Sequence, residues 1–249
     1  PGSRDTHPMT FLNQLTSKGT AILMSLAFLS SLTAHAALYD VVLLGGQSNM
    51  LGRASSTGLS SELANSQDDV LFYYGSGQVV TDNANKDTLT TLRPGSGTDI
   101  GPEVAFGLTV AGGQPAVNLA LIKHAHGGTN LHTQWDPNPG SAYSAFQSTV
   151  SNGLAALTSA GHTYNITGML WNQGESDAKS RSTAEYQADL NEFIADVRAN
   201  YGADLPFFIS RLADTQTAVN APGLANIRAA QENVAAGNAF AYLVDTDGM

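Results

Sequence analysis

Short apolar runs alternate with polar, glycine-containing stretches along this chain. The three clearest runs cover residues 39–44, 115–125 and 166–171. Runs of this kind, rich in Val, Ile and Leu and bounded by turn residues, are typical of buried strands in a parallel sheet. Residues 70–74 predict a strand or an edge hairpin, and further strands are predicted at 207–210 and 240–244.

Between these runs, apolar residues recur at helical spacing. The predicted helices cover residues 103–110, 142–160, 183–201 and 224–235. Ser182 and Gly202 are the predicted cap and stop of the third helix, and Pro102 suits a first-turn position. Strands and helices in alternation predict a parallel sheet covered by helices. The Gly, Ser and Asn of residues 75–100 predict surface loops, and we find neither an internal repeat nor an interdomain linker.

Length and composition fit one domain with a sizeable core, since the chain has 249 residues of which 42% are hydrophobic. A net charge of −10 argues against nucleic acid or an anionic membrane as a partner. Only 13% of the residues are charged, which suits an extracellular protein that acts on neutral polysaccharide. The absence of cysteine from the sequence excludes a disulfide framework and a cysteine nucleophile.

The N-terminal segment has the three regions of a secretory signal peptide. Lys18 precedes an apolar stretch at residues 21–32, and Ala34-His35-Ala36 forms a small-x-small cleavage site. The apolar stretch is short for a bilayer span, and a buried N-terminal helix is the alternative. We therefore expect a secreted or periplasmic protein without membrane contact after cleavage. The predicted parts are upstream residues 1–8, a signal peptide at 9–36 and the mature domain at 37–249.

Polar residues that suit acyl transfer follow the three clearest strands. Ser48 lies in Gly45-Gly46-Gln47-Ser48-Asn49-Met50, directly after the first run, where open α/β sheets bind ligands. A helix-capping turn is the alternative. The run at 115–125 ends in His126-Gly127-Gly128-Thr129, and the run at 166–171 ends in Asn172-Gln173-Gly174-Glu175-Ser176-Asp177. A serine nucleophile and glycine N–H donors are the groups that acyl transfer needs.

Six stretches occur in the order seen in the sialate O-acetylesterase-like domain of the SGNH hydrolases, which this chain resembles over nearly all of residues 39–249. They are GGQSNMLGR, DIGPEVAFG, KHAHGGT, WNQGESD, IRAAQ and VDTDG. That domain includes the acetylxylan esterases of carbohydrate esterase family six. The resemblance implies a flavodoxin-like three-layer α/β/α fold with a central parallel sheet. It also implies removal of acetyl groups from sugar hydroxyls, with no metal and no cofactor.

The resemblance implies roles for particular residues. Ser48 attacks the acetyl carbonyl and forms an acetyl-serine intermediate. Its backbone N–H, with that of Gly127 or Gly128, holds the developing oxyanion. Gln173 supplies a side-chain donor to the same oxyanion.

Carboxylates and substrate contacts are less sharply defined. Glu175 is a catalytic or supporting acid, or a structural acceptor for nearby backbone groups. Asp245 and Asp247 are alternative acids of the triad. Asn49 and Trp135 are candidate substrate contacts, although a single aromatic residue in a loop is as often a packing residue.

The general base is missing from the expected place. The family supplies a histidine shortly after a segment like residues 245–248, whereas this sequence stops at Met249. We therefore expect a C-terminal truncation and slow turnover by this chain. His162 lies before a strand whose far end holds the site, which argues against it. The histidines around the glycine loop could substitute, and they are His124, His126 and His132.

The expected substrate is an acetylated polysaccharide or an acetylated sugar, of the acetylxylan or sialate type. One alternative is an SGNH esterase that acts on other acyl esters, which would need an apolar acyl pocket. The other is a non-catalytic carbohydrate-binding relative, favoured by the missing histidine.

Overall fold

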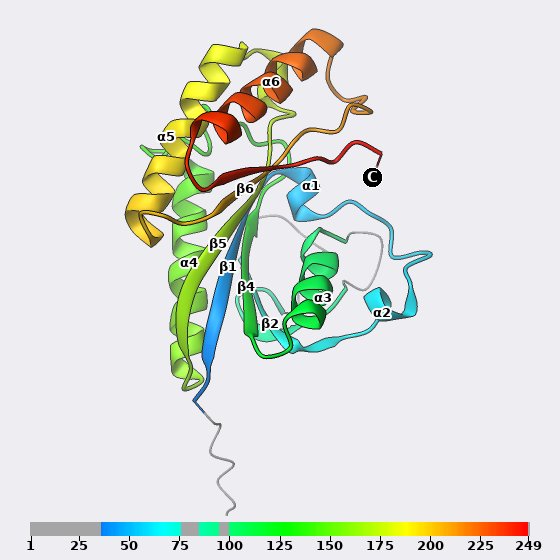
Figure 1. Cartoon of the computed structure of the whole chain (residues 1–249), viewed down its shortest axis with the longest axis vertical. Helices are drawn as coiled ribbons and strands as arrows, with labels where there is room; N and C mark the ends of the chain where they lie inside the picture. The colour runs from blue at the N-terminus through cyan, green and yellow to red at the C-terminus, as the bar shows by residue number, and fades with distance from the viewer. Residues whose placement is uncertain (1–35, 76–84, 95–99, 249) are drawn as a thin grey trace, which may run out of the picture. The chain divides into compact units, whose positions relative to one another are not determined.

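The computed structural model describes residues 36–75, 85–94 and 100–248 (Figure 1). The predicted upstream residues and, apart from Ala36, the predicted signal peptide lie outside this part of the chain. A seven-stranded sheet has the order β3-β2-β4-β1-β5-β6-β7, and every pairing is parallel except that of β2 with β3. The strands are β1 Leu38–Gly46, β2 Gln67–Tyr74, β3 Leu89–Leu92, β4 Asn118–Ala125, β5 Thr163–Asn172, β6 Phe207–Ser210 and β7 Ala241–Val244.

Helices cover both faces of the sheet, as Figure 1 shows for α3 and α4. They are α1 Ser48–Leu51, α2 Ser61–Ala64, α3 Glu103–Gly113, α4 Ser141–Ser159, the 3₁₀ helix η2 Asp177–Lys179, α5 Thr183–Tyr201 and α6 Ala221–Gly237. The expected three-layer α/β/α class is confirmed. Relative to the flavodoxin order, in which the first strand adjoins the second, β4 lies between β1 and β2.

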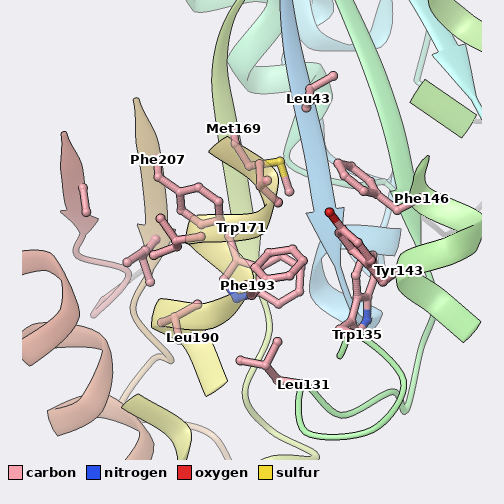
Figure 2. Close-up of a cluster of buried hydrophobic side chains, with 14 of the residues drawn as sticks. Leu43, Leu131, Trp135, Tyr143, Phe146, Met169, Trp171, Leu190, Phe193 and Phe207 are labelled. Carbon is pink, nitrogen blue, oxygen red and sulfur yellow. The ribbon is translucent and has the colours of Figure 1, made fainter. Parts of the chain in front are cut away.

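Strand β1 is buried on both faces, which explains its continuous apolar run. Val41 and Leu43 join a large cluster with side chains of α4, α5 and α6. Figure 2 shows part of this cluster, including Trp135, Trp171 and Phe193. On the other face, the neighbouring residues of β1 pack against Met50 and Leu51 of α1 and against α3.

Predicted and observed elements differ most at β3. This strand lies within residues 75–100, where we predicted surface loops, and that prediction was wrong at residues 89–92. Only Leu92 of its four residues is fully buried, so the apolar pattern is weak and pairing with β2 makes the strand. Because β3 pairs with β2, β3 forms the edge of the sheet and β2 lies inside it. Among the helices of the described residues, none has the length and apolar character needed to cross a bilayer.

Candidate active site

Three strand ends meet at the carboxyl edge of the sheet. Gly46, the last residue of β1, is in register with Ala125 of β4 and Asn172 of β5. Two backbone hydrogen bonds continue the alignment, from His126 N to Gly46 O at 3.1 Å and from Gln47 N to Asn172 O at 3.0 Å. The chain leaves β1 toward β2 and leaves the adjacent strand β5 toward β6, in opposite directions along the sheet. This is the topological switch point at which open α/β sheets bind ligands.

Ser48 begins the single turn of α1 immediately beyond this edge. Gly46 has a φ of +150°, and a Cβ at this position would collide with the carbonyl of Asn172, so only glycine permits the close approach. Ser48 is half-buried. Within the described residues, neither its hydroxyl nor its backbone N–H has a hydrogen-bond partner, so both are available to a substrate.

A buried amide network joins the loops beyond the three strands. The Gln173 side chain is fully buried, and its Nε2 donates to Gln47 Oε1 at 3.1 Å, Thr129 O at 3.1 Å and Asp177 Oδ2 at 2.6 Å. An amide nitrogen carries two hydrogens, and these are already engaged by protein oxygens. The sequence-based role of Gln173 as an oxyanion donor is therefore corrected: its buried amide joins Gln47, Thr129 and Asp177 and so ties the loops together.

Hydrogen bonds to buried side chains hold the glycine loop after β4, residues 126–129, in place. Thr129 Oγ1 donates to His126 O at 2.7 Å and accepts from Trp135 Nε1 at 2.9 Å, and Leu131 N donates to Asp177 Oδ2 at 2.8 Å. Gly128 is exposed at the tip of the loop with a φ of +76°. Trp135 is 0% exposed and packs edge-on against Trp171, with ring centroids 5.0 Å apart. Its suggested role in stacking on a sugar is thus wrong, and the packing alternative holds.

Glu175 and Asn49 form a polar pair beside Ser48. Asn49 Nδ2 donates to Glu175 Oε1 at 2.5 Å, and Asn49 itself is exposed. Glu175 is 6% exposed, and its Oε2 is buried without a partner in the described part of the chain. Burial raises the pKa of this carboxyl group above its ordinary value. Hydrogen bonds to the carboxylate lower the pKa, but their effect is smaller. One oxygen of Glu175 therefore accepts a hydrogen bond from Asn49, and the other is buried and accepts none from the described residues.

The four candidate histidines lie in different environments. His124 is buried, with Nδ1 2.5 Å from Gly75 O, and burial lowers its pKa to about 4. His132 is exposed, and its Nδ1 lies 3.7 Å from Asp189 Oδ2. His162 accepts from Ala37 N at 3.4 Å, at the opposite ends of the strands. His126 is half-buried and directly follows β4, and its backbone N–H donates to Gly46 O, two residues before Ser48.

No histidine of the described residues hydrogen-bonds to Ser48. The acids at the end of β7 are paired with arginines instead. Arg228 donates to both carboxylate oxygens of Asp247 at 2.8 Å, and Arg211 Nη2 lies 2.5 Å from Asp245 Oδ1. The Asp247 N–H, which donates to Asp245 Oδ1, and then Arg211 hold the pKa of Asp245 below its ordinary value, and Arg228 lowers the pKa of Asp247. In the three described ranges, His, Asp and Glu side chains form no group of three that could hold a metal ion.

A buried ion pair under α1 was not anticipated. Lys123, on β4, is 2% exposed and donates to Glu103 Oε2 at 2.6 Å and to Leu51 O at 3.0 Å. Leu51 is the last residue of α1, so this ammonium group binds the end of the helix that Ser48 begins. A lysine inside an otherwise apolar strand is the sequence signal that could have identified it.

The family model for carbohydrate esterases described as sialic acid-specific acetylesterases matches residues 38–249. The chain belongs to this family. It is therefore a carboxylic ester hydrolase, as the resemblance implied. The comparison with curated proteins gives no match.

Solved structures with the same fold include a protein from Arabidopsis thaliana with 18% sequence identity and a TM-score of 0.65, the match covering 84% of this chain and 86% of that one. A carbohydrate acetylesterase from Xanthomonas citri has 18% identity and a TM-score of 0.58, with 83% and 49% coverage. NanS has 14% identity and a TM-score of 0.60, with 84% and 77% coverage. At these identities the likeness concerns the fold.

Proposed function

We propose that this esterase removes O-acetyl groups from sugar hydroxyls, with Ser48 as the nucleophile. The observation that carries the proposal is the position of Ser48. It lies just beyond the central strand β1, whose end is in register with the ends of β4 and β5, and it is half-buried with a hydroxyl that has no partner among the described residues. Family membership favours an esterase over a non-catalytic sugar-binding protein.

The reaction proceeds by two acyl transfers. Ser48 Oγ attacks the acetyl carbonyl carbon and gives its proton to the general base, the bond to the sugar oxygen breaks, and the sugar takes up that proton and leaves as an alcohol. Water then attacks the acetyl-serine and releases acetate. In this proposal the Ser48 N–H and a glycine N–H from residues 127–128 stabilise each oxyanion, and one such donor typically contributes about 3 kcal/mol.

The polar pair supports the same chemistry. We assign Glu175 as the catalytic or supporting acid of the site, because one of its oxygens is unpartnered within the described residues. We assign Asn49, whose side chain is hydrogen-bonded to Glu175, to contact with the sugar. His126 is the candidate base that the described residues offer. His126→Ala should then slow the reaction of Ser48 with an organophosphate, whereas unchanged labelling would exclude it as the base.

Ser48→Ala tests the nucleophile. The variant should lose all esterase activity and all organophosphate labelling while keeping its thermal midpoint. Ser159→Ala is the matched control, because Ser159 is exposed at the end of α4 next to the start of β5, far from the site. Labelling at another residue, or full turnover by Ser48→Ala, would contradict the proposal.

Substrate and compartment are proposed on separate grounds. Parallel assays with acetylated xylan and O-acetylated sialic acid distinguish the two sugar types that the family resemblance suggests.

Export is proposed from the signal-peptide pattern of residues 9–36. N-terminal sequencing of the protein from the extracellular or periplasmic fraction should begin at Ala37, and an intact N-terminus there would refute cleavage.

A further inference from the structure

A cavity of about 480 Å³ opens beside the proposed nucleophile. This volume lies within the range of about 300–1,000 Å³ that is usual for small-molecule sites. Asn49, the residue after Ser48, is part of its lining, and consecutive Cα atoms lie only about 3.8 Å apart. Aliphatic side chains dominate the remaining lining, which includes Leu59, Leu63, Ile100, Pro102, Val104 and Ala105.

The walls of this groove are fixed by backbone contacts. Ala54 and Ile100 form an antiparallel bridge, with N–H to O distances of 3.2 and 2.9 Å. Gly52, with a φ of +111°, brings the end of α1 against Gly101, where a Cβ would come within 2.6 Å of the Gly101 nitrogen. Lys123 joins the end of α1 to Glu103 in the facing wall. The groove therefore exists before substrate binds.

We propose that this groove binds the alkyl chain of acyl groups longer than acetyl, so that the enzyme also cleaves longer-chain esters. This inference rests on Ser48 as the nucleophile. An ester bound there has two arms, and the two sides of Asn49 differ in chemistry: its amide contacts the carboxylate of Glu175, whereas the groove is apolar. The polar alcohol arm suits the Glu175 side, and the alkyl arm suits the groove.

The size of the groove supports this assignment. An acetyl methyl group leaves most of 480 Å³ unfilled. Each further methylene that leaves water for an apolar wall should raise kcat/KM by up to roughly fourfold. Sugar-binding sites need several convergent polar groups, and the groove lining contains only Asn49 and Arg53 as polar side chains.

The test uses p-nitrophenyl acetate, butyrate, hexanoate and octanoate with the 249-residue protein. The wild type should show a kcat/KM that rises from acetate through hexanoate. Ala105→Trp places a large ring in the groove and should lower the ratio of hexanoate to acetate kcat/KM by at least about tenfold. Thr109→Trp is the matched control, because Thr109 is exposed one turn further along α3 and does not line the groove. It should leave the ratio unchanged.

The other outcomes overturn the proposal. A steep fall from acetate to butyrate in the wild type would show that the groove is closed to acyl chains. An equal loss on acetate and hexanoate in Ala105→Trp would place the alcohol in the groove. Organophosphate labelling of Ser48, measured in parallel, separates these results from a failure of the nucleophile assignment, since labelling persists if only the acyl preference is wrong.

Discussion

Replacing Lys123 by methionine should separate the stability of the buried ion pair from its effect on the site. Lys123→Met keeps most of the aliphatic volume but removes the ammonium group that contacts Glu103 and Leu51 O. Glu103 is only 8% exposed, so its carboxylate would remain buried without its cation. Removing one partner of such a pair typically destabilises a protein by about 3–5 kcal/mol. The loss includes the cost of an unpaired carbonyl at Leu51, about 1–3 kcal/mol.

The double variant Lys123→Met/Glu103→Met is the decisive comparison. Replacing both charges by apolar groups of similar size is often neutral, so its free energy of unfolding should return to within about 1–2 kcal/mol of the wild type. The contact to Leu51 O is absent from both variants. Because α1 is a single turn that cannot hold itself in place, Ser48 should remain displaced.

Urea unfolding and steady-state kinetics on p-nitrophenyl acetate measure the two effects. We expect kcat to fall by about tenfold or more in both variants, since small misplacements of reacting groups can cost about a hundredfold. KM should change little. A double variant that regains both stability and kcat would refute the reasoning and reduce Lys123 to a structural residue.

Two further predictions concern buried polar residues. Burial lowers the pKa of His124 from 6.5 to about 4, so the folded state disfavours its protonation and about 3 kcal/mol of stability should be lost as the pH falls from above 6.5 to below 4. Urea unfolding at several pH values should show this dependence in the wild type but not in His124→Gln, and equal dependence would contradict it. Asp177→Asn should lower kcat by about tenfold with little change in KM, because Leu131 N loses a carboxylate acceptor and the glycine loop loosens. Asp189→Asn, which weakens the contacts of Asp189 with Arg181 and His132 but leaves the acceptor of Leu131 N in place, is the control, and an equal loss there would contradict a specific role.

The sequence was most informative where one local rule decides the structure. Strand β1 is buried on both faces, so its apolar run is continuous. Helix α5 begins at Thr183 after the predicted cap, because Ser182 and Glu185 form a capping box. The placement of Ser48 at a strand end followed from the same reasoning.

Long-range contacts decided what the sequence could not show. Gln173 and Trp135 have the residue types of an oxyanion donor and a sugar platform, yet both are fully buried. Their burial depends on partners up to 126 positions away, such as Gln47 for the amide. Strand β3 depends in the same way on pairing with β2. Residue type and spacing do not report such partners, whereas a lysine in an apolar strand does signal one.

The central place of β1 also determines when the site can form during synthesis. Val41 pairs with Ala120 on one side and with Ile166 on the other, so an early strand waits for segments made much later. Contacts so distant in sequence make folding slow. Until β4 and β5 emerge, the backbone N–H and C=O groups along both edges of β1 are open to pairing with other chains. Ser48 therefore gains its surroundings only when nearly three quarters of the polypeptide, on the order of 175 residues, has been made.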